Sequence, residues 1–282
     1  MAQTLRPASG PLDYGNRLWR KILFVAILIA FYAPIATLIA FSFNTDKRGV
    51  VWRGFTWDNY EKAWNNVALQ EALLNSLTIA FIATIIATII GAMAALFLWR
   101  FRFPFKPAYE GVMALPIVIP EICMGVSLLL FFIYTGMMGW SVGMPWPLNL
   151  INIIIAHVAF CFPFVAVVVR SRLVGFNRQL EEASKDLGAS EWQTFWNVIL
   201  PFMMPGLVAG ALLAFTLSLD DFVITFFTSG PETVTFPVKV YSLVRRGVSP
   251  EINAASTVLI VITVIATIIA MKLQAPQKTG EG

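Results

Sequence analysis

Long uncharged blocks of apolar residues alternate with short polar segments along the chain. A helix needs about 20 apolar residues to cross the hydrocarbon layer of a membrane. The third predicted span contains Pro116, Pro120 and Glu121, and the fifth contains Asp220 and Asp221. We therefore predict an all-α polytopic membrane protein in which residues 1–282 form one transmembrane domain. Its six spans are expected at about residues 22–43, 73–98, 112–134, 150–169, 202–228 and 254–271.

Composition agrees with this pattern and excludes several function classes. Hydrophobic residues make up 58% of the chain and charged residues 13%, whereas soluble domains are about 25% charged. The net charge of +4 lies in short loops beside apolar blocks, so we predict no nucleic-acid binding. One histidine and two separated cysteines provide no metal cluster and no nucleophile–base pair, which argues against a metal site and against a membrane-bound enzyme.

The distribution of basic residues predicts the orientation of the spans. With six spans both termini lie on one side, and that side receives thirteen of the 20 Lys and Arg residues. Short cytoplasmic loops of membrane proteins are enriched in Lys and Arg. We therefore expect both termini in the cytoplasm and the surface of the spans in contact with membrane lipid.

The segment at residues 171–201, between the fourth and fifth spans, is the longest predicted cytoplasmic connection and is built like two short helices. Asn177 is a suitable N-cap, and acidic side chains follow in the first turn, where they suit the helix dipole. Gly188 is placed to end the first helix in a left-handed conformation. Ser190 and Gln193 then fit a capping box for the second helix. The pattern predicts a helical hairpin; on its own it would be no more than a connection between two spans.

This segment resembles the EAA motif of ABC importer permeases, which reads Glu-Ala-Ala, three residues, Gly, nine residues and then Ile-x-Leu-Pro. Ser184 replaces the second Ala of the motif and Val198 replaces the Ile. The residues that match in register are Glu182, Ala183, Gly188, Leu200 and Pro201.

The resemblance implies a type I ABC importer permease fold, with the hairpin as the coupling helix that docks onto a cytoplasmic ATPase subunit. No G-x-x-x-x-G-K-[ST] string occurs in the chain, so ATP and Mg²⁺ are expected on separate subunits and no cofactor is expected here. The predicted ATPase-coupling residues are Glu181, Glu182, Ala183, Lys185, Asp186, Leu187 and Gly188.

Three carboxylates inside the predicted spans, Glu121, Asp220 and Asp221, suggest a polar path. A charged side chain at the bilayer centre costs about 2.5–3.5 kcal/mol on insertion scales, so it needs a cavity or a partner. Adjacent helical residues point about 100° apart, so we expect one Asp to meet solute and the other to cap a backbone or to pair. Phe222 follows the Asp pair, and carboxylates with aromatic rings suit an ammonium solute. A helix break, an interface ion pair or a lipid-facing Phe is the alternative.

Five further segments look like the spermidine/putrescine permease family, closest to I-type second permease subunits of putrescine importers. One departure is Glu121, where close relatives are expected to carry Asp. The family implies a heterodimer with a second permease subunit, two ATP-binding subunits and a periplasmic solute-binding protein. The matching segments are residues 115–122, 156–161, 214–221, 229–231 and 249–254.

Two functions are therefore compared. The first is an ABC permease for polyamines, or for another cationic solute, an amino acid or an opine. The second is an ion-coupled secondary transporter that uses its membrane carboxylates as proton or sodium sites. The hairpin favours the first, because a secondary transporter needs no ATPase dock. For the single histidine, His157, we expect a hydrogen-bonded role in packing.

Overall fold

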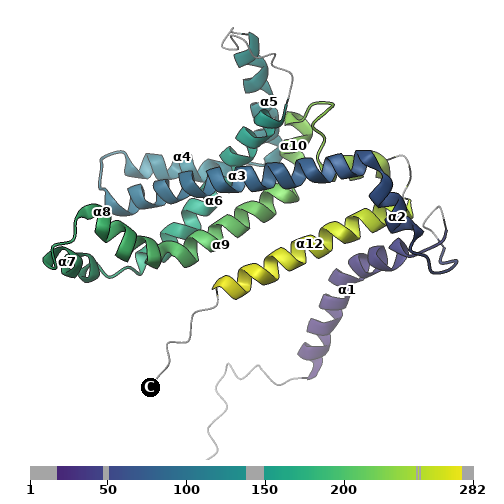
Figure 1. Ribbon diagram of the computed structural model, residues 1–282, viewed down its shortest axis with the longest axis horizontal. Helices are drawn as coiled ribbons and strands as arrows, with labels where there is room; N and C mark the ends of the chain where they lie inside the picture. The colour runs from purple at the N-terminus through teal and green to yellow at the C-terminus, as the bar shows by residue number, and fades with distance from the viewer. Residues whose placement is uncertain (1–17, 47–50, 138–148, 246, 248, 275–282) are drawn as a thin grey trace, which may run out of the picture.

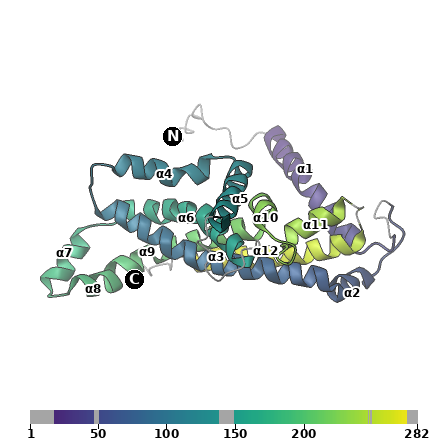
Figure 2. The same ribbon diagram turned by 90° about the horizontal axis from the view of Figure 1, so that it is seen from above.

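A computed structural model describes residues 18–46, 51–137, 149–245, 247 and 249–274, almost all of them helical. Three long helices run side by side and form the centre of the molecule (Figures 1 and 2): α3 (Val67–Arg100), α6 (Leu150–Val174) and α9 (Leu200–Leu219). The remaining elements are α1 (Leu18–Ser42), α2 (Asp58–Asn65), α4 (Lys106–Val118), α5 (Glu121–Met137), α7 (Gln179–Asp186), α8 (Glu191–Thr194), the π-helical turn η1 (Phe195–Ile199), α10 (Val223–Thr228), α11 (Phe236–Val244) and α12 (Pro250–Gln274).

Small residues allow the three central helices to pack closely. A Cβ atom on Gly91 of α3 would lie 2.7 Å from the Phe162 carbonyl oxygen and 2.7 Å from Cβ of Val165 on α6. On α9, a Cβ atom on Gly210 would lie 3.0 Å from Cγ1 of the same valine. Membrane helices associate through such small-residue contacts, because lipid removes the hydrophobic drive between helices.

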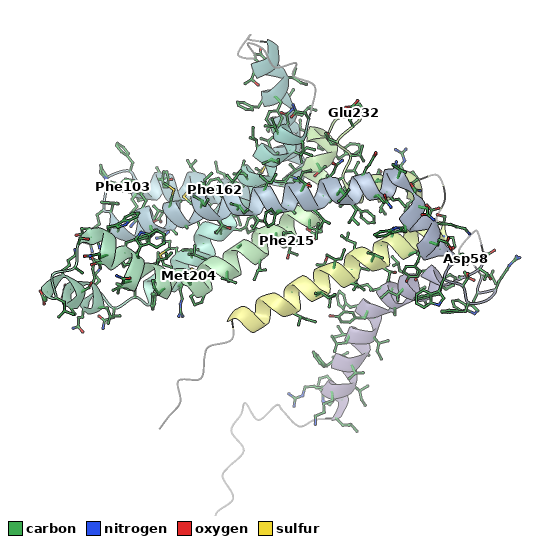
Figure 3. The ribbon with its side chains drawn as sticks, in the orientation of Figure 1. Asp58, Phe103, Phe162, Met204, Phe215 and Glu232 are labelled. Atoms are coloured by element: carbon green, nitrogen blue, oxygen red, sulfur yellow. The ribbon has the colours of Figure 1, made fainter. Side chains whose placement is uncertain are left out.

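The predicted spans are largely present. Four helical segments are long and apolar enough to cross a membrane, Leu18–Ser42, Val67–Arg100, Leu150–Val174 and Glu191–Leu219. The predicted sixth span is α12, whose apolar portion, Pro250–Ile265, is shorter. Side chains of α1 project without a neighbouring helix along most of its length (Figure 3), and none of its apolar window is buried.

The third predicted span is not one continuous helix. It is broken into α4 and α5, which meet at an angle of 106°. Pro120 disfavours helical geometry at the residue before it, and Ile119 is accordingly extended, with φ −69° and ψ 134°. The predicted span over residues 112–134 is therefore present as two helices with a bend between them, and Glu121 becomes the first residue of α5.

The fifth predicted span also ends early. α9 stops at Leu219, and α10 begins only at Val223. Asp220 and Asp221 therefore lie in a break between two helices. We predicted both inside the fifth span with a helix break as the alternative, and the structure shows the break. The break has a function in the fold. It frees backbone N–H groups at the start of α10, and these donate hydrogen bonds to the Asp221 carboxylate.

The two ends of the molecule carry different structures. The α7–α8 hairpin lies at one end of the long axis, and α2 lies at the opposite end (Figures 1 and 2). α2 is anchored by Asn59, whose side-chain amide donates to the carbonyl oxygens of Ser42 and Asn44 at 2.9 and 2.8 Å. The hairpin, the break between α4 and α5 and the break between α9 and α10 are places where the structure departs from simple spanning helices.

Candidate functional site

The α7–α8 hairpin has the local structure that the sequence predicts. Gly188 ends α7 with a φ of +84°, which glycine adopts without steric cost. Ser190 and Gln193 form a capping box at the start of α8. Asn177 differs slightly from the prediction, because α7 begins one residue later; its Oδ1 accepts a hydrogen bond from the Gln179 backbone at 3.0 Å.

Most of the predicted coupling residues form the exposed surface of the hairpin. Leu187, at the turn, is 89% exposed, the highest fraction among the large apolar side chains that the structure describes. Lys185 is partly buried. The exposed members of the predicted set are Glu182, Ala183, Asp186, Leu187 and Gly188.

Glu181 is the exception, since its side chain points into the protein and only 6% of the residue is exposed. Both of its carboxylate oxygens accept hydrogen bonds from Nη1 of Arg100 at 2.6 Å, and Lys185 lies 3.1 Å away. Burial by itself would raise the pKa of Glu181, but the bonds from Arg100 and Lys185 outweigh it and hold the pKa below its ordinary value. Hydrogen bonds to Glu191 and Glu181 raise the pKa of Lys185.

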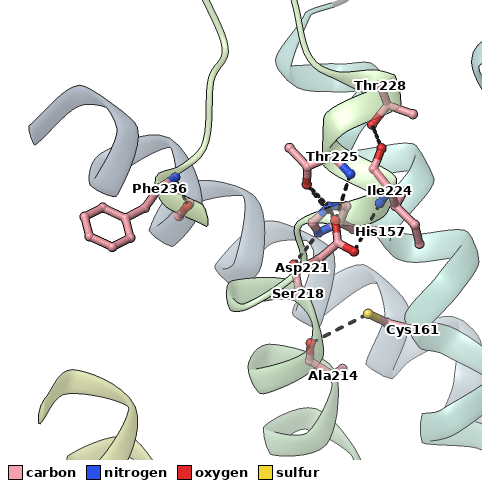
Figure 4. Close-up of polar contacts among 10 residues, drawn as sticks. His157, Cys161, Ala214, Ser218, Asp221, Ile224, Thr225, Thr228 and Phe236 are labelled. Atoms are coloured by element: carbon pink, nitrogen blue, oxygen red, sulfur yellow. Dashed lines mark hydrogen bonds and ion pairs between the residues drawn. The ribbon is translucent and has the colours of Figure 1, made fainter. Parts of the chain in front are cut away.

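The second candidate region is the break between α9 and α10, where Asp221 is the centre of a buried polar network (Figure 4). Its Oδ2 accepts from the backbone N–H and the hydroxyl of Thr225, both at 2.8 Å, and its Oδ1 accepts from the Ile224 N–H at 3.3 Å. Asp221 therefore caps α10, one of the two roles predicted for the Asp pair.

His157 on α6 completes this network. Its Nε2 lies 2.9 Å from the Thr225 hydroxyl and 3.4 Å from the Asp221 carboxylate, and its Nδ1 lies 2.7 Å from the Ser218 hydroxyl. The Thr225 hydroxyl donates its one hydrogen to Asp221, so it accepts from Nε2; in a neutral ring, Nδ1 then accepts from Ser218. The expected hydrogen-bonded packing role of His157 is confirmed.

Asp220 and Glu121 are both exposed on the protein surface, unlike Asp221. The carboxylates of Glu121 and Asp221 are the charged neighbours of Asp220. Phe222 is partly buried, and its ring lies 4.7 Å from the ring of Tyr241 on α11. The break thus carries the exposed Asp220 and the ring of Phe222, with Glu121 of α5 as a charged neighbour of Asp220. The structure also brings Tyr241 to this site, where the sequence did not place it.

Sequence reasoning also missed Arg100, Glu191 and the partners of His157. Arg100 is 81 residues from Glu181 along the chain, and no local pattern connects the two. Within the part of the chain that the structure describes, no group of three or more His, Cys, Asp or Glu residues could hold a metal ion.

Comparison with curated proteins places the chain beside polyamine permeases. It is 41% identical over 264 residues to the spermidine/putrescine transport system permease protein PotC of Escherichia coli K12, covering 94% of this chain and 96% of PotC. It is also 41% identical over 258 residues to the putrescine transport system permease protein PotI of the same organism, covering 91% of each chain. The resemblance to the I-type subunit is real, but identity to the C-type subunit is equal.

Solved structures support the fold. A chain of a bacterial ABC transporter that imports the acidic polysaccharide alginate superimposes with a TM-score of 0.71 at 17% identity, over 93% of this chain and 100% of that one. A chain of the MetNI methionine ABC transporter gives a TM-score of 0.56 at 21% identity, over 73% and 94%. The family described as "binding-protein-dependent transport system inner membrane component" matches residues 87–276. The protein belongs to this family of inner membrane transport components.

Proposed function

We propose that this chain is a permease subunit of an ATP-driven ABC importer that moves polyamines from the periplasm into the cytoplasm. The observation that carries the proposal is the 41% identity to both PotC and PotI over more than nine-tenths of the chain. The exposed hairpin supports it independently, because it presents a rigid surface for a cytosolic motor.

The partners follow from the same proposal. A second permease subunit would form a heterodimer with this chain and cover surface that is exposed here, including the unburied span α1. Two ATP-binding subunits would bind the hairpins in the cytoplasm, and a periplasmic binding protein would deliver solute at the α2 end. Both termini are cytoplasmic in this arrangement, in agreement with the excess of Lys and Arg on that side.

The ATPase subunits would contact the hairpin through the exposed side chains of Glu182 and Asp186, with Leu187 as the apolar anchor and Lys185 at the edge. Closure of the ATPase dimer would then move the α7–α8 hairpin as one rigid body, because the turn at Gly188 holds its two helices together. Movement of packed helices as rigid bodies is a common basis of such transitions.

The polyamine path would run along the break between α9 and α10. Asp220 and Glu121 would pair with ammonium groups, and the rings of Phe222 and Tyr241 would stabilise the same cation through cation–π contact. Asp221 would support the path without contacting the solute, because its network with His157 holds the break in position. A polyamine carries several ammonium groups, so residues of the second permease would complete the path.

The test is reconstitution of the transporter with its partner subunits into proteoliposomes. We expect uptake of radiolabelled putrescine or spermidine that requires both ATP and the binding protein. Asp220→Asn should lower this uptake about tenfold, the effect of losing about 1.4 kcal/mol of binding, whereas Glu110→Gln on α4, which pairs with Arg170 and not with the break, serves as a control. Uptake driven by an ion gradient without nucleotide would refute the proposal. ATP-dependent uptake of amino acids without any uptake of polyamines would refute the assigned substrate.

A further inference from the structure

The hairpin is attached to the helix bundle by the chain itself at only two points, the end of α6 and the start of η1. α3 has no such connection to it, although α3 packs against both α6 and α9. Side chains at the end of α3 join it to the hairpin directly, and the shortest of these contacts is made by Arg100. Arg100 is the last residue of α3, and its guanidinium holds both oxygens of Glu181 on α7 at 2.6 Å.

This contact is built more firmly than a surface ion pair. The Glu181 side chain is only 8% exposed and the Arg100 side chain 33%. Exposed ion pairs are weak because water screens them and two long side chains must be ordered. A shielded guanidinium–carboxylate pair is both stronger and more directional. Removing Arg100 would leave the buried Glu181 carboxylate with Lys185 as its remaining cationic neighbour.

Ionic contacts around this pair also connect the two helices of the hairpin to each other. Lys185 of α7 lies 3.1 Å from Glu181 and 2.6 Å from Glu191 of α8, and Arg100 lies 3.5 Å from Glu191. The Ser184 and Thr194 hydroxyls meet at 3.1 Å across the turn. α7, α8 and the end of α3 therefore form one connected unit.

An aromatic contact holds the neighbouring residue of α3 to the segment between α6 and α7. The ring of Trp99 lies 5.4 Å from the ring of Phe176, edge to face at 90°. The guanidinium of Arg178 lies 5.5 Å from the centre of the Trp99 ring. The end of α3 is thus held by the contacts of Trp99 with Phe176 and Arg178 and by the ion pair of Arg100 with Glu181.

At its far end α3 contacts the elements beside the proposed solute path. Its 34 residues extend for about 51 Å at 1.5 Å per residue. There the Asn75 amide donates to the Val234 carbonyl at 3.2 Å, and the Ser76 hydroxyl accepts from the Phe236 N–H at 2.9 Å. Phe236 begins α11, the helix that carries Tyr241.

We infer that the Arg100–Glu181 pair is the link through which movement of the hairpin displaces α3, so that Glu181 is a positioning residue inside the transporter and not an ATPase contact. The inference rests on the proposed function. The chain itself pulls α6 and α9, and α3 packs against both; this pair and the Trp99 contact add a direct connection between the end of α3 and the hairpin. α3 then carries the displacement to α11 at the opposite end of the bundle.

The test measures solute moved per ATP hydrolysed in proteoliposomes that hold the complete transporter. Glu181→Gln keeps the side-chain size and removes the charge. We expect ATP hydrolysis within about twofold of the wild type and a fall of about fivefold in putrescine moved per ATP, within the range for residues that transmit coupling. The charge-exchanged variant Arg100→Glu with Glu181→Arg should restore at least half of that ratio.

Glu110→Gln is the matched control, because Glu110 of α4 makes a 2.8 Å ion pair with Arg170 of α6 that does not involve α7 or α8. It should leave the ratio unchanged. A wild-type ratio in Glu181→Gln would overturn the inference and leave the proposed function intact. Loss of assembly in both Glu181→Gln and the exchanged variant would overturn it too, since the pair would then only hold the fold. Absence of ATP-dependent uptake in the wild type would instead refute the proposed function.

Discussion

Asp220 and Asp221 are adjacent residues of the same type, yet the structure predicts opposite consequences for replacing each with Asn. Asp221 is 8% exposed and accepts three hydrogen bonds, from the Ile224 N–H, the Thr225 N–H and the Thr225 hydroxyl. Asp220 is exposed. We expect Asp221→Asn to destabilise the protein, and Asp220→Asn to leave its stability unchanged while lowering polyamine uptake.

The size of the difference follows from the geometry of Asp221. An Asn side chain keeps one acceptor oxygen, which can replace Oδ2 and retain the two 2.8 Å bonds from Thr225. Its NH₂ group then faces the Ile224 N–H, so two donors meet and one bond is lost. An unsatisfied buried donor costs about 1–3 kcal/mol, which reduces the folded-to-unfolded ratio about 5- to 150-fold. An exposed substitution usually changes stability by less than about 0.5 kcal/mol.

Thermal unfolding of the purified transporter in detergent, followed by loss of monodispersity, measures the effect. The midpoint of Asp221→Asn should fall by about 2–10 °C, and that of Asp220→Asn should stay within about 1 °C of the wild type. Asp220→Asn is the internal control, because it makes the same chemical change one residue away. Equal midpoints for the two variants would show that the buried network around His157 does not stabilise the break.

Three more predictions concern packing and coupling. Gly91→Ala should lower the thermal midpoint, because its Cβ would lie 2.7 Å from Val165 and overpacking costs about 1–3 kcal/mol; Gly111→Ala, with open space around it, should not lower it. Gly188→Pro should abolish coupled uptake, because proline cannot adopt a φ of +84°; wild-type transport per ATP would contradict this. The Glu181 pKa is lowered, so its stabilisation is complete above the ordinary Glu pKa of about 4.3 and is lost as pH falls through the folded value. Hydrogen exchange of α7, corrected for intrinsic rates, should therefore be constant from pH 7 to about 5 and increase only in more acidic solution.

The predicted elements that agree with the structure depend on local interactions. The hairpin is the best example: Gly188, Ser190 and Gln193 act on the backbone within three residues, so spacing along the chain is sufficient to place the turn and the capping box. The positions of the spans can be predicted for the same reason, because length and apolarity are properties of one segment. The differences lie at Ile119 and Asp220, where one predicted apolar span is divided into two helices.

By itself, the sequence determined that the chain spans a membrane, that it carries a hairpin between its fourth and fifth spans, and that carboxylates are present within apolar segments. Only the tertiary structure decided which carboxylates are buried and what they contact. Asp221 meets His157 from another helix, and Glu181 meets Arg100, 81 residues away. Such pairings depend on how helices pack, and the pattern of one segment carries no information about the side chain that an antiparallel or crossing neighbour brings to it.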